Sequence, residues 1–176
     1  QPMSSTPSAA PAGSELTSTE IDARHARSLV ERALSQIERG ERQQAELAVR
    51  QAMHLAPRVA VIHSLAGLLA LLDGDIETAR IGYENAVQDF SKVSPERERL
   101  IALRMAQADH SGVEAGAFVP SLPNEIARLR ALAQATPSQD FLSDPQHPNS
   151  AGPRVPYKTE TPAMVAPTPA IAASQQ

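Results

Sequence analysis

The 176-residue chain contains no cysteine. It therefore forms no disulfide bond, thiolate zinc site or cysteine nucleophile, although this absence says little about the compartment in which the protein works. Acidic and basic residues nearly balance, at a formal net charge of −4, and their signs are interleaved along the sequence. The chain thus lacks the basic stripe that binding to nucleic acid requires, and an anionic membrane surface is an equally poor match.

A long apolar run is also missing. The most apolar stretch is VIHSLAGLLALLDG, from Val61 to Gly74, which ends in acidic residues and glycine. Crossing a hydrocarbon layer of roughly 30 Å takes about 20 apolar residues, so this stretch is too short to span a membrane. Two interpretations remain, a buried core helix and an apolar surface for a docking partner, and we expect it to be both.

No catalytic or metal-binding pattern is present. The sequence has no glycine-rich phosphate loop, no G-x-S-x-G elbow and no convincing Ser/His/Asp set. Asp73, Asp75 and Glu77 lack the glycine and oxygen spacing of a calcium loop. The histidines show no paired spacing for zinc, and we expect them to be surface or partly buried residues: His25, His54, His63, His110 and His147. We therefore expect no enzyme, no cofactor and no metal site.

Proline divides the chain. Eleven of the 15 prolines lie in residues 1–19 and 136–176, which have few bulky apolar side chains and no sustained periodicity. Such segments bury too little surface to offset the entropy lost on ordering, so both are predicted to be disordered. PRVP at 153–156 matches a minimal PxxP ligand, but a tether or spacer is the better interpretation of this tail. The folded domain is predicted over 20–110, followed by a loop and a further helix in 111–135.

The middle of the chain repeats itself. A shift of 34 residues superimposes small residues on small residues and bulky on bulky, pairing Ala26 with Ala60, Ala33 with Gly67, Leu34 with Leu68, Ile37 with Leu71, Gly40 with Gly74, Ala45 with Ala79 and Ala52 with Ala86. The repeats span 26–59 and 60–93. Each unit has the three-four apolar spacing of two amphipathic helices, which the glycine separates as a left-handed cap.

The helix boundaries follow from local signals. The second helix of the first unit is predicted from about Arg42 to Leu55, where Pro57 ends it. In the second unit, the predicted helices run from Val59 to Leu72 and from Ile76, after the N-cap Asp75, to about Val93. Ser94 and Pro95 then begin a capping helix over 95–109, and NEIARLRALAQA predicts a last helix over 124–135.

These residues resemble the tetratricopeptide repeat, a 34-residue helix-turn-helix family. The family pattern W-x2-L-G-x2-Y...A-x3-F aligns in the second unit with His63, Ala66, Gly67, Ala70, Ala79 and Tyr83, and in the first with Leu29, Arg32, Ala33, Gln36, Ala45 and Val49. Neither unit has the family tryptophan, and Ser91 stands where the second closing proline belongs. The resemblance covers 26–93 and implies a short right-handed all-α solenoid of antiparallel helix pairs that holds other proteins.

In such a fold the first helix of each unit lines an inner groove. The expected partner-binding residues are aliphatic and come from both units: Val30, Leu34, Ile37, Leu65, Leu68, Leu71 and Leu72. An apolar groove fits an amphipathic helix or an extended apolar peptide of a partner protein. The alternative is that these residues are core, filled by neighbouring helices or by the helix over 124–135. Because Val30, Leu34 and Leu65 occupy the places of the family's polar carboxylate clamp, we do not expect capture of a C-terminal carboxylate.

The function predicted from the sequence is a non-catalytic adaptor or assembly factor for protein complexes. The alternatives are a secretion chaperone that holds an exported subunit and a purely structural subunit of a multiprotein complex. The start at Gln1, followed by a Pro/Ser/Ala-rich spacer, suits removal of an export signal. It therefore favours the periplasm or cell surface, with the cytoplasm as the alternative. The oligomeric state is left open.

Overall fold

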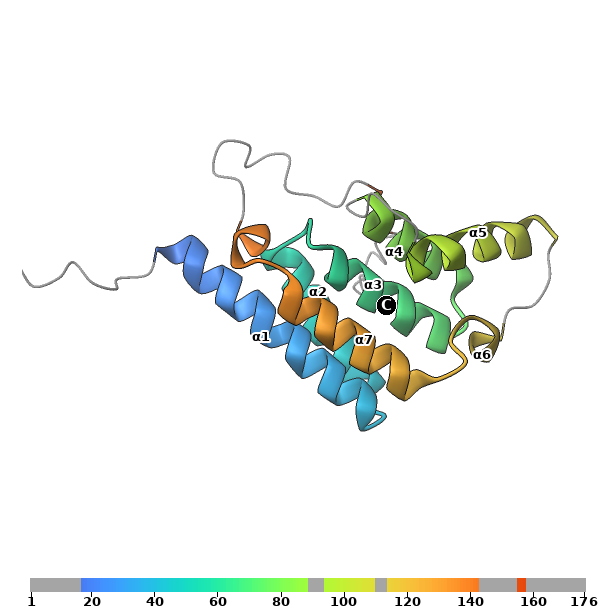
Figure 1. Ribbon diagram of the computed structural model, residues 1–176, viewed down its shortest axis with the longest axis horizontal. Helices are drawn as coiled ribbons and strands as arrows, with labels where there is room; N and C mark the ends of the chain where they lie inside the picture. The colour runs from blue at the N-terminus through green and yellow to red at the C-terminus, as the bar shows by residue number, and fades with distance from the viewer. Residues whose placement is uncertain (1–16, 89–93, 110–113, 143–154, 158–176) are drawn as a thin grey trace, which may run out of the picture.

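The computed structural model describes residues 17–88, 94–109, 114–142 and 155–157, and within these ranges the protein is all-α (Figure 1). The elements in chain order are α1 (Ser18–Glu38), α2 (Arg42–Leu55), α3 (Ala60–Leu72), α4 (Ile76–Gln88), α5 (Pro95–Ala108), α6 (Ala115–Phe118), α7 (Leu122–Ala135) and the 3-10 helix η1 (Ser138–Phe141). Helices α1 and α2 form one packed pair, and α3 and α4 form another.

The predicted caps and turns are present. Gly40 and Gly74 both have φ of 77°, the left-handed conformation that lets a helix end and the chain reverse. Asp75 begins α4, since its carboxylate accepts a hydrogen bond of 3.1 Å from the backbone N–H of Thr78. Ser94 begins α5 in the same way, with the side chain accepting from the N–H of Arg97 and proline in the first turn. The predicted end of α4 at Val93 lies outside the described residues.

Helix α3 occupies the centre of the fold. It packs against α4, against α2 and against α7, and ten of its 13 residues are buried, including His63 and Ser64. A helix covered on several sides has no face that needs polar side chains, which explains its all-round apolar sequence. Burial of each leucine stabilises the fold by roughly 1.5–3 kcal/mol, so α3 supplies much of the core.

Helix α5 covers the second pair with one face only. Leu100 and Leu103 are buried, whereas Ile101 and Met105 are 53% and 62% exposed. The sequence predicted a capping helix over 95–109. In the structure only part of its apolar side chains cover the second pair, because those at 101 and 105, one turn apart, point to solvent.

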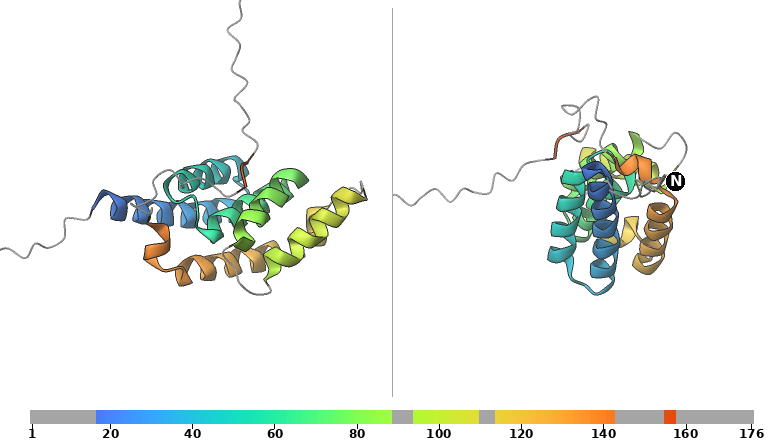
Figure 2. Two further views of the ribbon diagram at one scale, coloured as in Figure 1. Left: turned by 90° about the horizontal axis from the view of Figure 1, so that it is seen from above. Right: turned by 90° about the vertical axis from the view of Figure 1, so that its left-hand side faces the viewer.

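Helix α7 begins two residues before its predicted start and packs along α1 and α3 (Figures 1 and 2). Two short segments beyond it differ from the predicted disordered tail. η1 packs against α1 with Phe141 only 1% exposed, and residues 155–157 contact α3 and α4. Each segment carries an aromatic residue, which buries enough surface to hold a short stretch of chain. None of the described helices is both long and apolar enough to cross a membrane.

Candidate functional site

The seven aliphatic residues predicted to line a groove lie in the interior of the structure. Six are at most 3% exposed: Val30, Leu34, Ile37, Leu65, Leu68 and Leu71. Leu72, the seventh, is partly buried against the same core. We call the surface of α1 and α3 that faces α7 the inner face. A partner reaches the inner face only where α7 does not already cover it.

Helix α7 lies on the inner face as an amphipathic helix lies in a groove. Its buried apolar residues are Ile126, Leu129 and Ala133, at positions i, i+3 and i+7, and each is at most 2% exposed. This spacing places them on one side of the helix. This arrangement matches the alternative interpretation of the sequence, in which the helix over 124–135 of the same chain covers the aliphatic residues.

Charged side chains fix one side of α7 to α5. Both oxygens of the Glu125 carboxylate accept hydrogen bonds from Arg99, one of them at 2.7 Å. Arg128 bridges Glu125 at 2.7 Å and Glu96 at 2.6 Å. Glu96 also accepts from the hydroxyl of Ser64 on α3, at 3.3 Å. Two guanidinium groups balance the charges of two carboxylates, as the buried Glu96 and Glu125 require.

The titration of Glu125 reflects this cluster. Burial alone raises the pKa of its carboxyl, but the hydrogen bonds and charges of Arg99 and Arg128 outweigh that effect and hold the pKa at about 2. Burial likewise raises the pKa of Tyr83, beneath the Arg99 guanidinium. At neutral pH, Glu125 is therefore an ionised anchor and Tyr83 a neutral phenol. Among the buried side-chain atoms of the described residues, three have no hydrogen-bond partner: the Tyr83 hydroxyl, one oxygen of Glu96 and the amide oxygen of Gln36.

The other side of α7 is tied to α1. Arg130 pairs with Glu38 at 3.0 Å and with Glu31 at 3.4 Å. Arg27 of α1 donates to the carbonyls of Ala133, at 3.1 Å, and Thr136, at 2.7 Å, at the carboxyl end of α7. A cation at this end also suits the helix dipole. Polar contacts on both sides thus set the position of a helix whose middle is held by apolar packing.

A second arrangement lies at α3 and α4, where His63 and Asn85 hold residues 155–157. Asn85 donates to the carbonyl of Val155 at 2.9 Å and accepts from its N–H at 2.7 Å. Nδ1 of His63 lies 2.7 Å from the Tyr157 hydroxyl, and the two rings stack with centroids 5.8 Å apart. His63 and Asn85 are both buried, at 1% and 3% exposed. We call His63, Asn85 and their surroundings the His63–Asn85 site.

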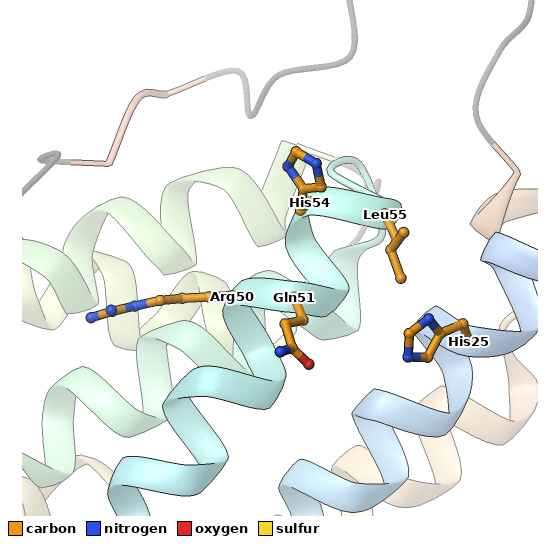
Figure 3. Close-up of a pocket in the computed structure, with 5 residues that line it drawn as sticks. All are labelled: His25, Arg50, Gln51, His54 and Leu55. Carbon is orange, nitrogen blue, oxygen red and sulfur yellow. The ribbon is translucent and has the colours of Figure 1, made fainter.

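Figure 3 shows a third feature, a hollow between α1 and α2. It is lined by His25, Arg50, Gln51, His54 and Leu55. Two histidines do not complete a metal site, and no group of three or more potential ligands occurs in the described part of the chain. The lining residues include no Ser, Thr, Cys or carboxylate beside the two histidines, so the hollow carries no functional assignment.

No protein-family model, curated protein or solved structure matches the chain. The resemblance to the tetratricopeptide family therefore depends on the repeated residues alone.

The His63–Asn85 site was missed in the sequence. His63 was expected to be a surface or partly buried residue, and Asn85 carried no motif. The one available signal was the PRVP sequence, which the tail interpretation set aside. Its second half, with the tyrosine that follows, is the segment that the site holds.

Proposed function

We propose that this protein is a non-catalytic adaptor of the tetratricopeptide type, which binds an amphipathic helix of a partner protein on its inner face. One observation carries the proposal: α7 lies on α1 and α3 with its apolar stripe inward. A helix in a groove is a recurrent mode of peptide recognition, read through anchors spaced i, i+3 and i+7. Ile126, Leu129 and Ala133 of α7 occupy these anchor positions.

In this proposal α7 is the resident occupant, and a partner helix takes its place. The apparent affinity for the partner is then lowered by the fraction of molecules in which α7 still covers the inner face. The partner needs apolar residues at the anchor positions. It also needs an acidic residue near Arg99 and a basic residue near Glu31 and Glu38. In α7 these are Glu125 and Arg130.

A structural subunit is the second candidate. Leu34, Leu65 and Leu68 are each 0% exposed, which favours this candidate. Binding of a partner at the surface does not make such core side chains accessible. Under this proposal α7 is a permanent part of the core, and partners bind elsewhere. The two candidates differ in whether the inner face accepts a helix supplied from outside.

A helix supplied in trans distinguishes them. The test uses the full chain with Leu129→Asp, which weakens docking of its own α7, and a fluorescent peptide of residues 121–136. The adaptor proposal expects saturable binding to this variant and weaker binding to the wild-type chain. A peptide that itself carries Leu129→Asp is the control and should not bind.

Circular dichroism establishes that the variant remains helical, and the milder Leu129→Ala replaces it if it does not. A helical variant that fails to bind the peptide contradicts the adaptor and supports the structural subunit. Equal affinity for the peptide with Leu129→Asp and for the unchanged peptide also contradicts the adaptor, because the anchor residue would then play no part in binding.

A further inference from the structure

Both hydrogen bonds between Asn85 and Val155 involve the backbone of Val155 and not its side chain. A carboxamide offers one donor and one acceptor side by side, which match the C=O and N–H of one residue in an extended chain. Asn85 is 3% exposed and satisfies both groups on a residue 70 positions away. A buried carboxamide without these partners would leave a donor and an acceptor unsatisfied, which is costly, so the site suits an extended segment.

His63 contacts the hydroxyl of Tyr157. The carbonyl of Pro57 only accepts hydrogen bonds, so Nε2 of His63, 2.6 Å away, is the donor there. In the neutral ring, Nδ1 is then an acceptor and receives a hydrogen bond from the Tyr157 hydroxyl at 2.7 Å. Burial raises the pKa of Tyr157, against a smaller lowering by Asn85, which keeps the hydroxyl protonated as the donor. Phenylalanine would leave Nδ1 without this bond.

The residue between them is proline, which suits the extended shape. Pro156 has a fixed φ and no N–H, and it restricts Val155 before it to extended conformations. The segment therefore loses little conformational entropy when it binds, as in other recognition of proline-containing peptides. The site thus contacts the backbone of Val155 and the side chain of Tyr157, while the exposed Pro156 keeps the segment extended between them.

This surface is separate from the inner face. In both views of Figure 2, residues 155–157 lie on the side of the fold away from α7. The two share α3, which contacts α7 and carries His63. A partner bound at one of these surfaces therefore does not block the other.

We propose that the His63–Asn85 site is a second protein-recognition site, specific for an extended segment with a Pro-Tyr pair, and that Val155–Tyr157 of the same chain closes it. Asn85 binds the backbone of the residue before the proline and His63 selects tyrosine by its hydroxyl and ring face. A partner segment of the same chemistry competes with the chain's own copy. The proposal does not depend on the adaptor function of the inner face.

The test supplies the segment in trans. The protein is the full chain with Tyr157→Ala, and the probe is a fluorescent peptide of residues 152–160, followed by anisotropy. We expect saturable binding, weakened about tenfold or more when the tyrosine of the peptide is phenylalanine, because a site that hydrogen-bonds a hydroxyl rejects the analogue without it. The wild-type chain should bind the peptide more weakly, since its own segment competes.

Variants identify the residues responsible. Asn85→Ala, added to Tyr157→Ala, should abolish binding, whereas Asn124→Ala, an exposed asparagine of α7, should leave it unchanged. If Asn85→Ala does not fold, a peptide N-methylated at its valine removes the donor to Asn85 and should also fail to bind. The inference is overturned if the helical Tyr157→Ala chain does not bind the peptide, or if neither change at the Asn85 contact reduces binding.

Sedimentation tests where the segment comes from. We expect the contact between Tyr157 and His63 to form within one chain, so Tyr157→Ala should not change the molecular mass measured by sedimentation. A dimer that Tyr157→Ala dissolves would place the segment in a second copy and overturn closure within one chain.

Discussion

Gly82 of α4 lies directly against Gly67 of α3. A β-carbon at position 82 would stand 2.7 Å from the amide nitrogen of Gly67 and 2.9 Å from its Cα. On the other side of this crossing, a β-carbon at position 67 would stand 2.9 Å from the ring of Tyr83. The two helices are therefore in backbone contact, and the ring fills the remaining space. This contact fixes where α4, and with it Asn85, stands relative to His63.

The first prediction concerns this crossing. Gly82→Ala should destabilise the fold, because overpacking typically costs about 1–3 kcal/mol and exceeds the gain of roughly 1 kcal/mol from a better helix former. Urea denaturation followed by circular dichroism measures the difference. Gly116→Ala is the control, since a β-carbon there meets nothing within 4 Å. Equal stability of Gly82→Ala and the wild type would show that the helices do not touch at this point.

The parts of the fold set by local chemistry were predictable. The repeated glycines at 40 and 74 mark the two left-handed turns, and Ser94 with Pro95 marks the start of α5. Each of these signals acts within a few residues, where the sequence directly constrains the backbone. The three-four apolar spacing likewise predicted which face of α1 is buried over residues 26–37.

What covers those faces was not predictable in the same way. An apolar stripe is equally suited to a helix of the same chain and to a helix of a partner, so Leu34 and Leu68 gave no means to choose. η1 is anchored by Phe141, and residues 155–157 by Tyr157 and the backbone of Val155. These groups contact residues far away in sequence. Their neighbours have the composition of a flexible tail, and no local pattern distinguishes the anchored residues.

The second prediction is a dependence on pH. Glu125 has a pKa of about 2 in the folded protein, against 4.5 for the unperturbed group. Its contribution to the free energy of unfolding is therefore present in full above pH 4.5 and is lost as the pH falls toward 2. Glu125→Gln should remove this part of the acid dependence. It should also lower the stability at pH 7 by about 3 kcal/mol, because Arg99 and Arg128 lose a buried anion.

Glu98→Gln is the matched control for this prediction. Glu98 lies in the first turn of α5, as Glu125 lies in the first turn of α7, but Glu98 is exposed. Urea midpoints measured from pH 7 to pH 2.5 should follow the wild type for Glu98→Gln and become flatter for Glu125→Gln. Parallel curves for Glu125→Gln and the wild type would mean that the carboxylate is not held ionised by its two arginines.

The third prediction concerns the anchor of η1. Phe141 is 1% exposed and its ring lies under the guanidinium of Arg27, 4.7 Å from ring centroid to Cζ. Phe141→Ala should lower the free energy of unfolding by about 3 kcal/mol and speed amide exchange in 138–142. The neighbouring Leu142 is 36% exposed, and Leu142→Ala should cost less than about 1 kcal/mol. Similar effects of the two changes would show that η1 is not anchored by its aromatic residue.

The last prediction concerns the end of α7. The guanidinium of Arg27 donates to two carbonyls there, those of Ala133 and Thr136, while its plane covers the ring of Phe141. A lysine ammonium is a point charge without the planar fork, so Arg27→Lys keeps the charge and loses the paired geometry. Since hydrogen bonds to charged groups contribute about 1.5–3 kcal/mol each, the loss of one should destabilise the fold by a similar amount.

Hydrogen exchange locates this effect within the fold. In Arg27→Lys, the amides of the last turn of α7 should exchange faster, while those in the middle of α3 keep their protection, because α3 is held by its own packing against α2 and α4. Arg24→Lys, an exposed arginine one turn earlier in α1, should change neither region. If α7 and α3 lose protection together, α7 does not open separately from the core. It then cannot give way to a partner helix, and the structural-subunit candidate gains over the adaptor.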